Sequence, residues 1–313
     1  MYTFIKEKSR IFYSEIITSK LFLVIVFLFI IYKFISNKIM GTSTFTALRS
    51  GILGILLYLA GLYIISLFST KEDKTRKIFD IDYKVAKLGF IVSSIYFVFL
   101  ITCTVDSLQR KEIFYGKPVL SYIPGYSWLM TFISNISLSV SNIAYFAETY
   151  QIENIIRGSI FYIFIPFIIF KLLGYKFKHL FSFKNTRASW PFLLIYLIIF
   201  LVSGLNTSRM WGLVYCILYP ALCEEFLHRG IIYRSAASIF NNTAKGLILG
   251  TLFFSLGHFP DYYYRIYEGN ILLTFGQMLS VFFNGILWTY GFRKTGTLVP
   301  WIIIHALSNI LVL

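Results

Sequence analysis

Residues 190–205 read WPFLLIYLIIFLVSGL, and residues 215–234 read YCILYPALCEEFLHRGIIYR. The first segment is apolar for almost its whole length, and the second has two adjacent glutamates inside an apolar run. A membrane-spanning helix needs roughly 20 predominantly apolar residues, and fewer where polar groups face a protein interior. Both segments are therefore predicted to be membrane-spanning helices.

Apolar segments of this kind recur along the chain and predict an all-α, polytopic bundle of about nine spans, with eight to ten allowed. The nine segments are about 21–35, 51–68, 88–105, 157–174, 190–205, 211–235, 246–259, 272–292 and 298–313. A tenth segment, 128–147, has serines and asparagines in its middle. It suits an interfacial or re-entrant helix as well as a span, and we leave it out of the count.

The composition excludes several classes of protein. Hydrophobic residues make up 57% of the 313 residues and charged residues only 14%, whereas globular domains carry about a quarter charged residues. A soluble enzyme, a disordered chain and a fibrous repeat are therefore excluded. The net charge of +15 arises from cations between the apolar runs, which is typical of a protein in a lipid bilayer rather than of a nucleic-acid partner.

The same cations predict the orientation. With the N-terminus inside, most Lys and Arg residues fall on the cytoplasmic side, including those of the segments 71–77 and 171–187. Counting 128–147 as a span moves the 171–187 loop outside, so the positive-inside rule favours nine spans and an external C-terminus. The segment from Met1 to Lys20 has no small-residue cleavage site before the first apolar run, and it indicates a retained cytoplasmic end.

The three cysteines predict neither a disulfide framework nor a thiolate metal site. Cys103, Cys216 and Cys223 are odd in number, lie in apolar runs and form no C-x-x-C pair. We interpret them as small buried hydrophobic residues.

The acidic residues point to a candidate site. Between Glu153 and Asp261 the only carboxylates are Glu224 and Glu225, inside an apolar helix. An ionisable group at membrane depth costs roughly 2.5–3.5 kcal/mol on insertion scales, and neighbouring like charges add repulsion. Such a pair indicates a functional site, the alternative being a structural ion pair between helices.

Helix geometry separates the roles of the two glutamates. Glu225 and Arg229 are four residues apart on one face and can neutralise each other. Glu224 is rotated by about 100° from Glu225, so its carboxylate is free for chemistry. His228 is four residues from Glu224 and either lines the site or is a structural bystander.

Two further segments carry polar groups within apolar helices. His258 ends the run LGTLFFSLGH, with Phe254 four residues earlier, and His305 lies in LVPWIIIHALSNI, with Asn309 four residues later. Together with Glu224 they supply a carboxylate, two imidazoles and a carboxamide. These groups suffice for a base that activates water and for donors to an oxyanion.

Three motifs occur in this order: Glu224-Glu225-x-x-x-Arg229, Phe254-x-x-x-His258 and His305-x-x-x-Asn309. They resemble those of the CAAX protease and bacteriocin-processing family (CPBP, or Abi) of intramembrane endopeptidases. The resemblance covers about residues 190–313. We therefore divide the chain into an N-terminal transmembrane region without a recognised motif, 1–155, and a CPBP-like catalytic transmembrane domain, 156–313.

The resemblance implies a glutamate-dependent protease without a covalent intermediate. Glu224 is then the general base, His258 helps to orient the water, and His305 with Asn309 stabilises the oxyanion. Glu225 and Arg229 hold the site in shape, with Phe254 as a further supporting residue. His228, in a variable position of the first motif, is a possible contributor.

Other interpretations of the site remain open at the level of sequence. Glu224, His258 and His305 could form a zinc site, but the sequence lacks H-E-x-x-H and offers no carboxylate near either histidine to accept from its other ring nitrogen, so no metal cofactor is expected. A di-iron bundle needs two Glu-x-x-His copies, and only one is present. A non-catalytic immunity or scaffold protein on the same fold is the main alternative to an enzyme, and a transporter is a weaker one.

The expected substrate is a peptide or a membrane-protein segment, with prenylated CAAX ends, peptide pheromones and bacteriocin precursors as examples that the family resemblance implies. We expect an integral membrane protein, of a bacterial cell membrane by composition, with a cavity that opens to the cytoplasm. Counting residues from the predicted helix ends places Glu224 and His305 in the cytoplasmic half of the membrane and His258 nearer the outer half.

Overall fold

The computed structural model describes residues 2–39, 41–69, 81–111, 118–143, 147–240 and 242–311. These residues form helices and connecting loops without any strand, which confirms the predicted all-α bundle. Lys71, Lys74, Arg76 and Lys77, which were predicted to lie in a cytoplasmic loop, are outside the described residues.

Nine apolar helical stretches correspond to the nine predicted spans. Six are long and apolar enough to cross a membrane: α2 (Lys20–Ile39), α3 (Thr44–Phe68), α4 (Tyr83–Arg110), Thr149–Leu172, Thr207–Phe240 and α13 (Ile271–Thr295). Three are shorter: Thr186–Val202, which includes α8 (Trp190–Val202), α12 (Thr243–Gly257) and α14 (Val299–Ile310). By length and composition, the described residues therefore form a polytopic membrane bundle.

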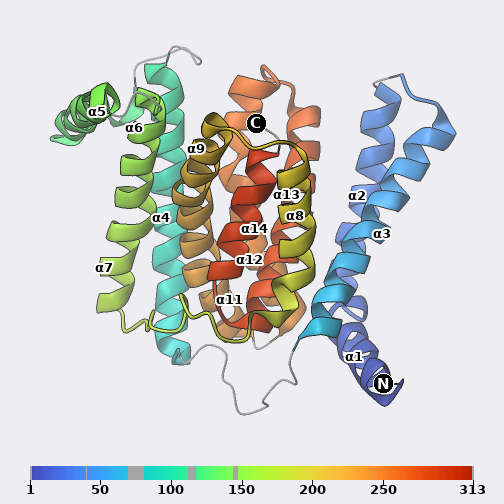
Figure 1. The fold of residues 1–313 in the computed structure, drawn as a ribbon. Helices are drawn as coiled ribbons and strands as arrows, with labels where there is room; N and C mark the ends of the chain where they lie inside the picture. Colours follow the sequence, from blue (N-terminus) through green and yellow to red (C-terminus); the bar gives the residue numbers. More distant parts are fainter. Residues whose placement is uncertain are drawn as a thin grey trace.

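Successive apolar helices run in alternate directions, so the two ends of the chain lie at opposite ends of the bundle (Figure 1). The loop between α7 (Ile165–Leu172) and α8 lies at the same end as α1 (Tyr2–Phe12) (Figure 1). That loop carries the basic 171–187 segment, so the main cationic loop and the N-terminal helix share one end. This end is called the basic end below, and its orientation toward the cytoplasm stays a prediction of the positive-inside rule.

The segment 128–147 falls largely on α5 (Tyr126–Ile143), which is not among the nine apolar stretches. In Figure 1, α5 lies beside the far end of the bundle, at a steep angle to the long helices. This placement agrees with leaving the segment out of the span count.

The most buried part of the bundle is its C-terminal half. In the most apolar 18-residue stretch of α13, half of the residues are buried, compared with 11% in the corresponding stretch of α2. The helices α2 and α3 lie at the edge of the bundle (Figure 1). Apolar side chains along α8 and α2 are exposed, as expected of surfaces that face lipid. Cys103, Cys216 and Cys223 are free and buried, as predicted.

The stretch Thr207–Phe240 is not a regular α-helix. It consists of α9 (Thr207–Cys216), η5 (Ile217–Ala221), α10 (Leu222–Glu224), η6 (Glu225–Tyr233) and α11 (Arg234–Phe240), where η5 and η6 are π-helical. Tyr219 has extended backbone angles, next to Pro220, which cannot donate a backbone hydrogen bond. Pro220 and the wide π-turns therefore bend the helix just before its two glutamates.

Candidate active site

The candidate site lies where three helical segments meet. Glu224 ends α10, Glu225 begins η6, His258 is the C-terminal cap of α12, and His305 lies in the middle of α14. Segments that are far apart in the sequence thus bring their polar groups into one region of the buried core.

Glu224 faces both imidazoles. Its Oε2 atom lies 4.0 Å from Nε2 of His258 and 3.7 Å from Nε2 of His305. The side chains of Glu224 and His258 are 18% and 28% exposed, whereas that of His305 is 4% exposed. His258 and part of the Glu224 side chain therefore reach the surface, whereas the Oε2 atom of Glu224 and the His305 ring are buried.

Glu225 has two partners. Its Oε1 atom lies 3.1 Å from NH1 of Arg229, as the spacing of four residues predicts, and 3.0 Å from Nδ1 of His305. The Glu225 side chain is fully buried. A carboxylate oxygen accepts hydrogen bonds, so Nδ1 of His305 carries the proton and its Nε2 atom is directed toward Glu224. The sequence contains no signal for this contact, because the residues are 80 positions apart.

His258 is oriented by its own helix. Its Nδ1 atom lies 2.9 Å from the backbone carbonyl oxygen of Phe254. A carbonyl only accepts, so Nδ1 is the protonated nitrogen and Nε2, which faces Glu224, has a free lone pair when the ring is neutral. The four-residue spacing of Phe254 and His258 thus sets the tautomer of the imidazole.

The ring of Phe254 is a common packing surface for the site. It lies 4.1 Å from the Arg229 guanidinium, and its centroid is 5.0 Å, 5.3 Å and 6.2 Å from those of His258, His228 and His305. A cation over an aromatic face is stabilised by the ring quadrupole. Phe254 therefore contacts the buried cation and all three imidazoles.

Sequence reasoning missed two residues of α13. Thr289 accepts a hydrogen bond from Nε of Arg229 at 3.2 Å, and the ring of Trp288 lies 4.3 Å from that of His305. Neither belongs to a motif, since α13 shows only general apolar character. Their part in the site depends on the packing of α13 against η6 and α14.

A third missed residue is Tyr262, in η7 (Asp261–Ile266), which follows α12. Its ring stacks on that of His258, with centroids 5.9 Å apart and planes at 20°. It lies on the accessible side of the site, four residues after His258. That spacing is the only sequence signal that could have indicated it.

Two predicted residues are less closely involved in the described structure. His228 is buried against Phe97 and Phe254, and no ion pair joins it to Glu224 in the described part of the chain. Asn309 lies one turn after His305 on α14, and its carboxamide makes no hydrogen bond to Glu224 or to the two imidazoles within the described residues. Their participation in chemistry stays a prediction.

The depths of Glu224 and His258 agree better than the sequence indicated. Glu224 Oε2 and His258 Nε2 lie 4.0 Å apart, so the two side chains share one depth of the bundle, although the sequence placed them in different halves of the membrane. Both helices are longer than predicted, since the segment that carries Glu224 runs from Thr207 to Phe240 and α12 begins at Thr243. The side on which the site opens stays a prediction.

The same side chains are the potential ligands of a metal ion. Among the described residues, no group of three or more His, Cys, Asp or Glu side chains is arranged to hold a metal ion. The sequence argument that neither histidine has a carboxylate near it is wrong for His305, whose Nδ1 atom contacts Glu225. The zinc alternative built on Glu224, His258 and His305 still gains no support from the arrangement of the described residues, and the reaction proposed below uses no metal. Independence of metal itself stays a prediction.

Comparison with known proteins adds one match. Residues 188–311 match the family model described as type II CAAX prenyl endopeptidase Rce1-like. No curated protein and no solved structure matches the chain significantly. The matched range contains all three motifs, from Glu224 to Asn309.

Proposed function

We propose that Glu224 is the catalytic base of this protein, whose residues 188–311 form an Rce1-like domain of the CPBP family of membrane proteases. The observation that carries the proposal is the position of Glu224 Oε2, 4.0 Å and 3.7 Å from two imidazole nitrogens of other helices. That oxygen is buried and has no hydrogen-bond partner among the described residues, so a water that donates to it would satisfy it. The proposed reaction is the hydrolysis of a peptide bond by that water.

In the first step, Glu224 accepts a proton from the water while the water oxygen attacks the carbonyl carbon of the peptide. His258 accepts a hydrogen bond from the same water at Nε2, since its Nδ1 atom donates to Phe254. The tetrahedral intermediate then collapses, the carbon–nitrogen bond breaks, and Glu224 returns its proton to the leaving amine. No covalent bond to the protein forms.

The oxyanion is stabilised from α14. Nδ1 of His305 donates to Glu225, so Nε2 donates to the oxyanion when the ring carries both protons. Glu224 is protonated in this intermediate, so Glu225 and the oxyanion itself balance the charge of that imidazolium. Asn309, one turn further along α14, is the proposed second donor.

Glu225 and Arg229 act as positioning residues. Their buried pair holds His305 through Nδ1 and places the guanidinium against Phe254 and Thr289. A side chain held on several sides keeps one orientation, which lowers the cost of reorganisation during the reaction. This role explains why two adjacent glutamates occur where one suffices for the chemistry.

The substrate class follows from the position of the site within the bundle. Glu224 and His258 are accessible, so we infer that an extended peptide or the end of a membrane-tethered protein reaches them. The family description names CAAX prenyl endopeptidases, so prenylated peptide ends are one candidate class. We further infer that the site opens toward the cytoplasm of a bacterial cell, on the basis of the charge distribution and composition.

Comparative peptidomics tests the function even though the substrate is not identified. Cells carrying the wild type and cells carrying Glu224→Gln are compared for membrane-associated and released peptides. We expect a defined set of cleavage products to disappear in the variant, because loss of a general base slows hydrolysis by about 10²–10⁴-fold.

The matched control is Glu268→Gln, which removes an exposed carboxylate in the loop before α13. It should retain the wild-type peptide pattern at equal expression. An unchanged pattern and unimpaired biological function in Glu224→Gln would instead favour the non-catalytic scaffold.

A further inference from the structure

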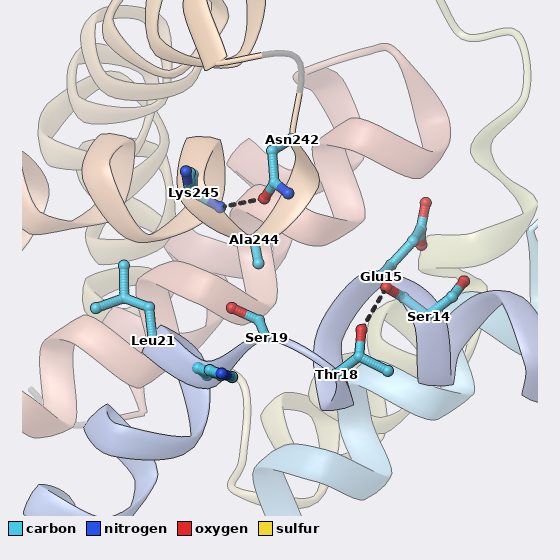
Figure 2. A pocket seen from close by; sticks show the side chains of 9 residues that line it. Ser14, Glu15, Thr18, Ser19, Leu21, Asn242, Ala244 and Lys245 are labelled. Carbon is cyan, nitrogen blue, oxygen red and sulfur yellow. Dashed lines mark hydrogen bonds between the residues drawn. The ribbon is translucent and has the colours of Figure 1, made fainter.

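A cavity of about 360 Å³ lies at the basic end of the bundle, far from the candidate active site along α12. It is bounded by η1 (Tyr13–Ile17), the start of α2 and the start of α12 (Figure 2). The cavity therefore lies between the N-terminal helices, which carry no recognised motif, and α12, whose other end holds His258.

The cavity presents hydrogen-bond donors to a ligand. Lys20 and Lys245 line it, and their ammonium groups make no ion pair or hydrogen bond within the described part of the chain. Ser19 also lines it, and its oxygen accepts from the backbone N–H of Phe22, which leaves the hydroxyl proton available. Asn242 accepts from the backbone N–H of Lys245 through its carbonyl oxygen, so its amide hydrogens are available as well. Two cations and two neutral donors thus border one space.

The one carboxylate that lines the cavity is already neutralised. Glu15 Oε2 lies 2.9 Å from Nζ of Lys294 and accepts a hydrogen bond from the Tyr290 hydroxyl, and its Oε1 atom lies 3.7 Å from NH2 of Arg293. Figure 2 shows the Glu15 carboxylate directed away from Ser19 and Asn242. The remaining charge at the cavity is positive, which favours an anionic ligand.

An apolar stripe continues from the cavity along α2. Leu21 lines the cavity, and it is exposed together with Val24, Leu28, Ile31 and Ile35. The spacing of three and four residues places these side chains on one face of the helix. A ligand with an anionic head and long apolar chains can therefore contact both the cavity and this stripe.

We propose that the cavity binds the phosphate headgroup of an anionic phospholipid, with its acyl chains along the exposed stripe of α2. Lys20 and Lys245 form charge-assisted hydrogen bonds to the phosphate, and Ser19 donates a third. Basic pockets between transmembrane helices are suited to anionic lipid headgroups. The lipid links η1 and α2 to α12 and stabilises the N-terminal helices on the bundle.

The test uses the full-length chain purified in a neutral detergent, with lipid binding followed by native mass spectrometry and by thermal unfolding. We expect phosphatidylglycerol to bind and to raise the unfolding temperature more than phosphatidylcholine does. Lys20→Gln/Lys245→Gln should weaken phosphatidylglycerol binding roughly 30-fold, because each lysine near a membrane surface contributes about fivefold.

The matched control is Lys178→Gln/Lys184→Gln, which removes two exposed cations at the same end of the bundle. It should bind phosphatidylglycerol as the wild type does. Equal weakening in both double variants would show a general surface-charge effect and overturn the proposal. Inorganic phosphate that reproduces the whole thermal shift would also overturn it, since the site would then be one for free phosphate.

If the Lys20→Gln/Lys245→Gln variant does not fold, Ser19→Ala provides the test. It leaves every charge in place and should weaken phosphatidylglycerol binding several-fold, and unchanged binding would contradict the proposal. None of these measurements uses peptide hydrolysis, so their outcome is independent of the proposed function.

Discussion

The Nδ1 atom of His305 lies 3.0 Å from Oε1 of Glu225, the same oxygen that lies 3.1 Å from NH1 of Arg229. One buried carboxylate therefore holds an imidazole on α14 and a guanidinium on its own helix. Because all three side chains are buried, removing one partner leaves a charge without compensation. This relationship gives the first prediction.

Glu225→Ala should lower the free energy of unfolding by about 3–5 kcal/mol, which is typical of breaking a buried ion pair. The measurement is thermal or denaturant unfolding of the purified protein in detergent. The double variant Glu225→Ala/Arg229→Met should be less destabilised than the sum of the two single variants, because it removes both charges. Strict additivity would contradict a direct interaction.

Thr289→Val tests the hydrogen bond from Nε of Arg229. Valine has nearly the same shape as threonine but no hydroxyl, so the buried N–H loses its partner. We expect a destabilisation of about 1–3 kcal/mol. Thr102→Val serves as the control, since the Thr102 hydroxyl only bonds to a carbonyl of its own helix at an exposed position. Equal destabilisation by the two substitutions would show that the Thr289 hydroxyl has no special role in the site.

Tyr262 is predicted to position the ring of His258, on which it stacks. Tyr262→Phe keeps the ring and should retain activity, whereas Tyr262→Ala should reduce kcat/KM about fivefold, as expected for loss of about 1 kcal/mol of aromatic contact. The assay is hydrolysis of a peptide identified by the peptidomic comparison. A loss in Tyr262→Phe equal to that in Tyr262→Ala would assign the effect to the hydroxyl instead.

Removal of metal ions should leave peptide hydrolysis unchanged, because the proposed reaction uses only Glu224, His258, His305 and Asn309. The purified protein is treated exhaustively with a chelator and assayed before and after addition of zinc. Activity that disappears on chelation and returns with zinc would contradict the metal-free mechanism. The Glu268→Gln variant, assayed in parallel, controls for effects of the chelator on the detergent-solubilised protein.

The contacts that were predictable are those within one helix. The four-residue spacings predicted the Glu225–Arg229 pair and placed Phe254 beside His258. The contact of Glu225 with His305 was not predictable, nor were the contacts of Trp288 and Thr289. They join residues on different helices, and a helix period contains no information about its neighbour.

The predicted depth of Glu224 shows the same limit. It was counted along a regular helix from a start near 211, whereas the segment begins at Thr207, bends near Pro220 and continues through π-helical turns to Phe240. Residue counting converts to distance only in a regular helix with known ends. Glu224 and His258 therefore had different apparent depths in the sequence and lie at one site in the structure.

By itself, the sequence determined the helical membrane bundle, its nine apolar segments and the motifs that bear the polar groups. These properties depend on local composition and on the helix period, both of which can be read from the chain. Only the tertiary structure decided that Glu225 holds His305, that Phe254 contacts three imidazoles and a guanidinium, and that η1 and the starts of α2 and α12 border one cationic cavity. Those arrangements depend on how helices pack and bend, because contacts between distant segments form only when the whole bundle has assembled.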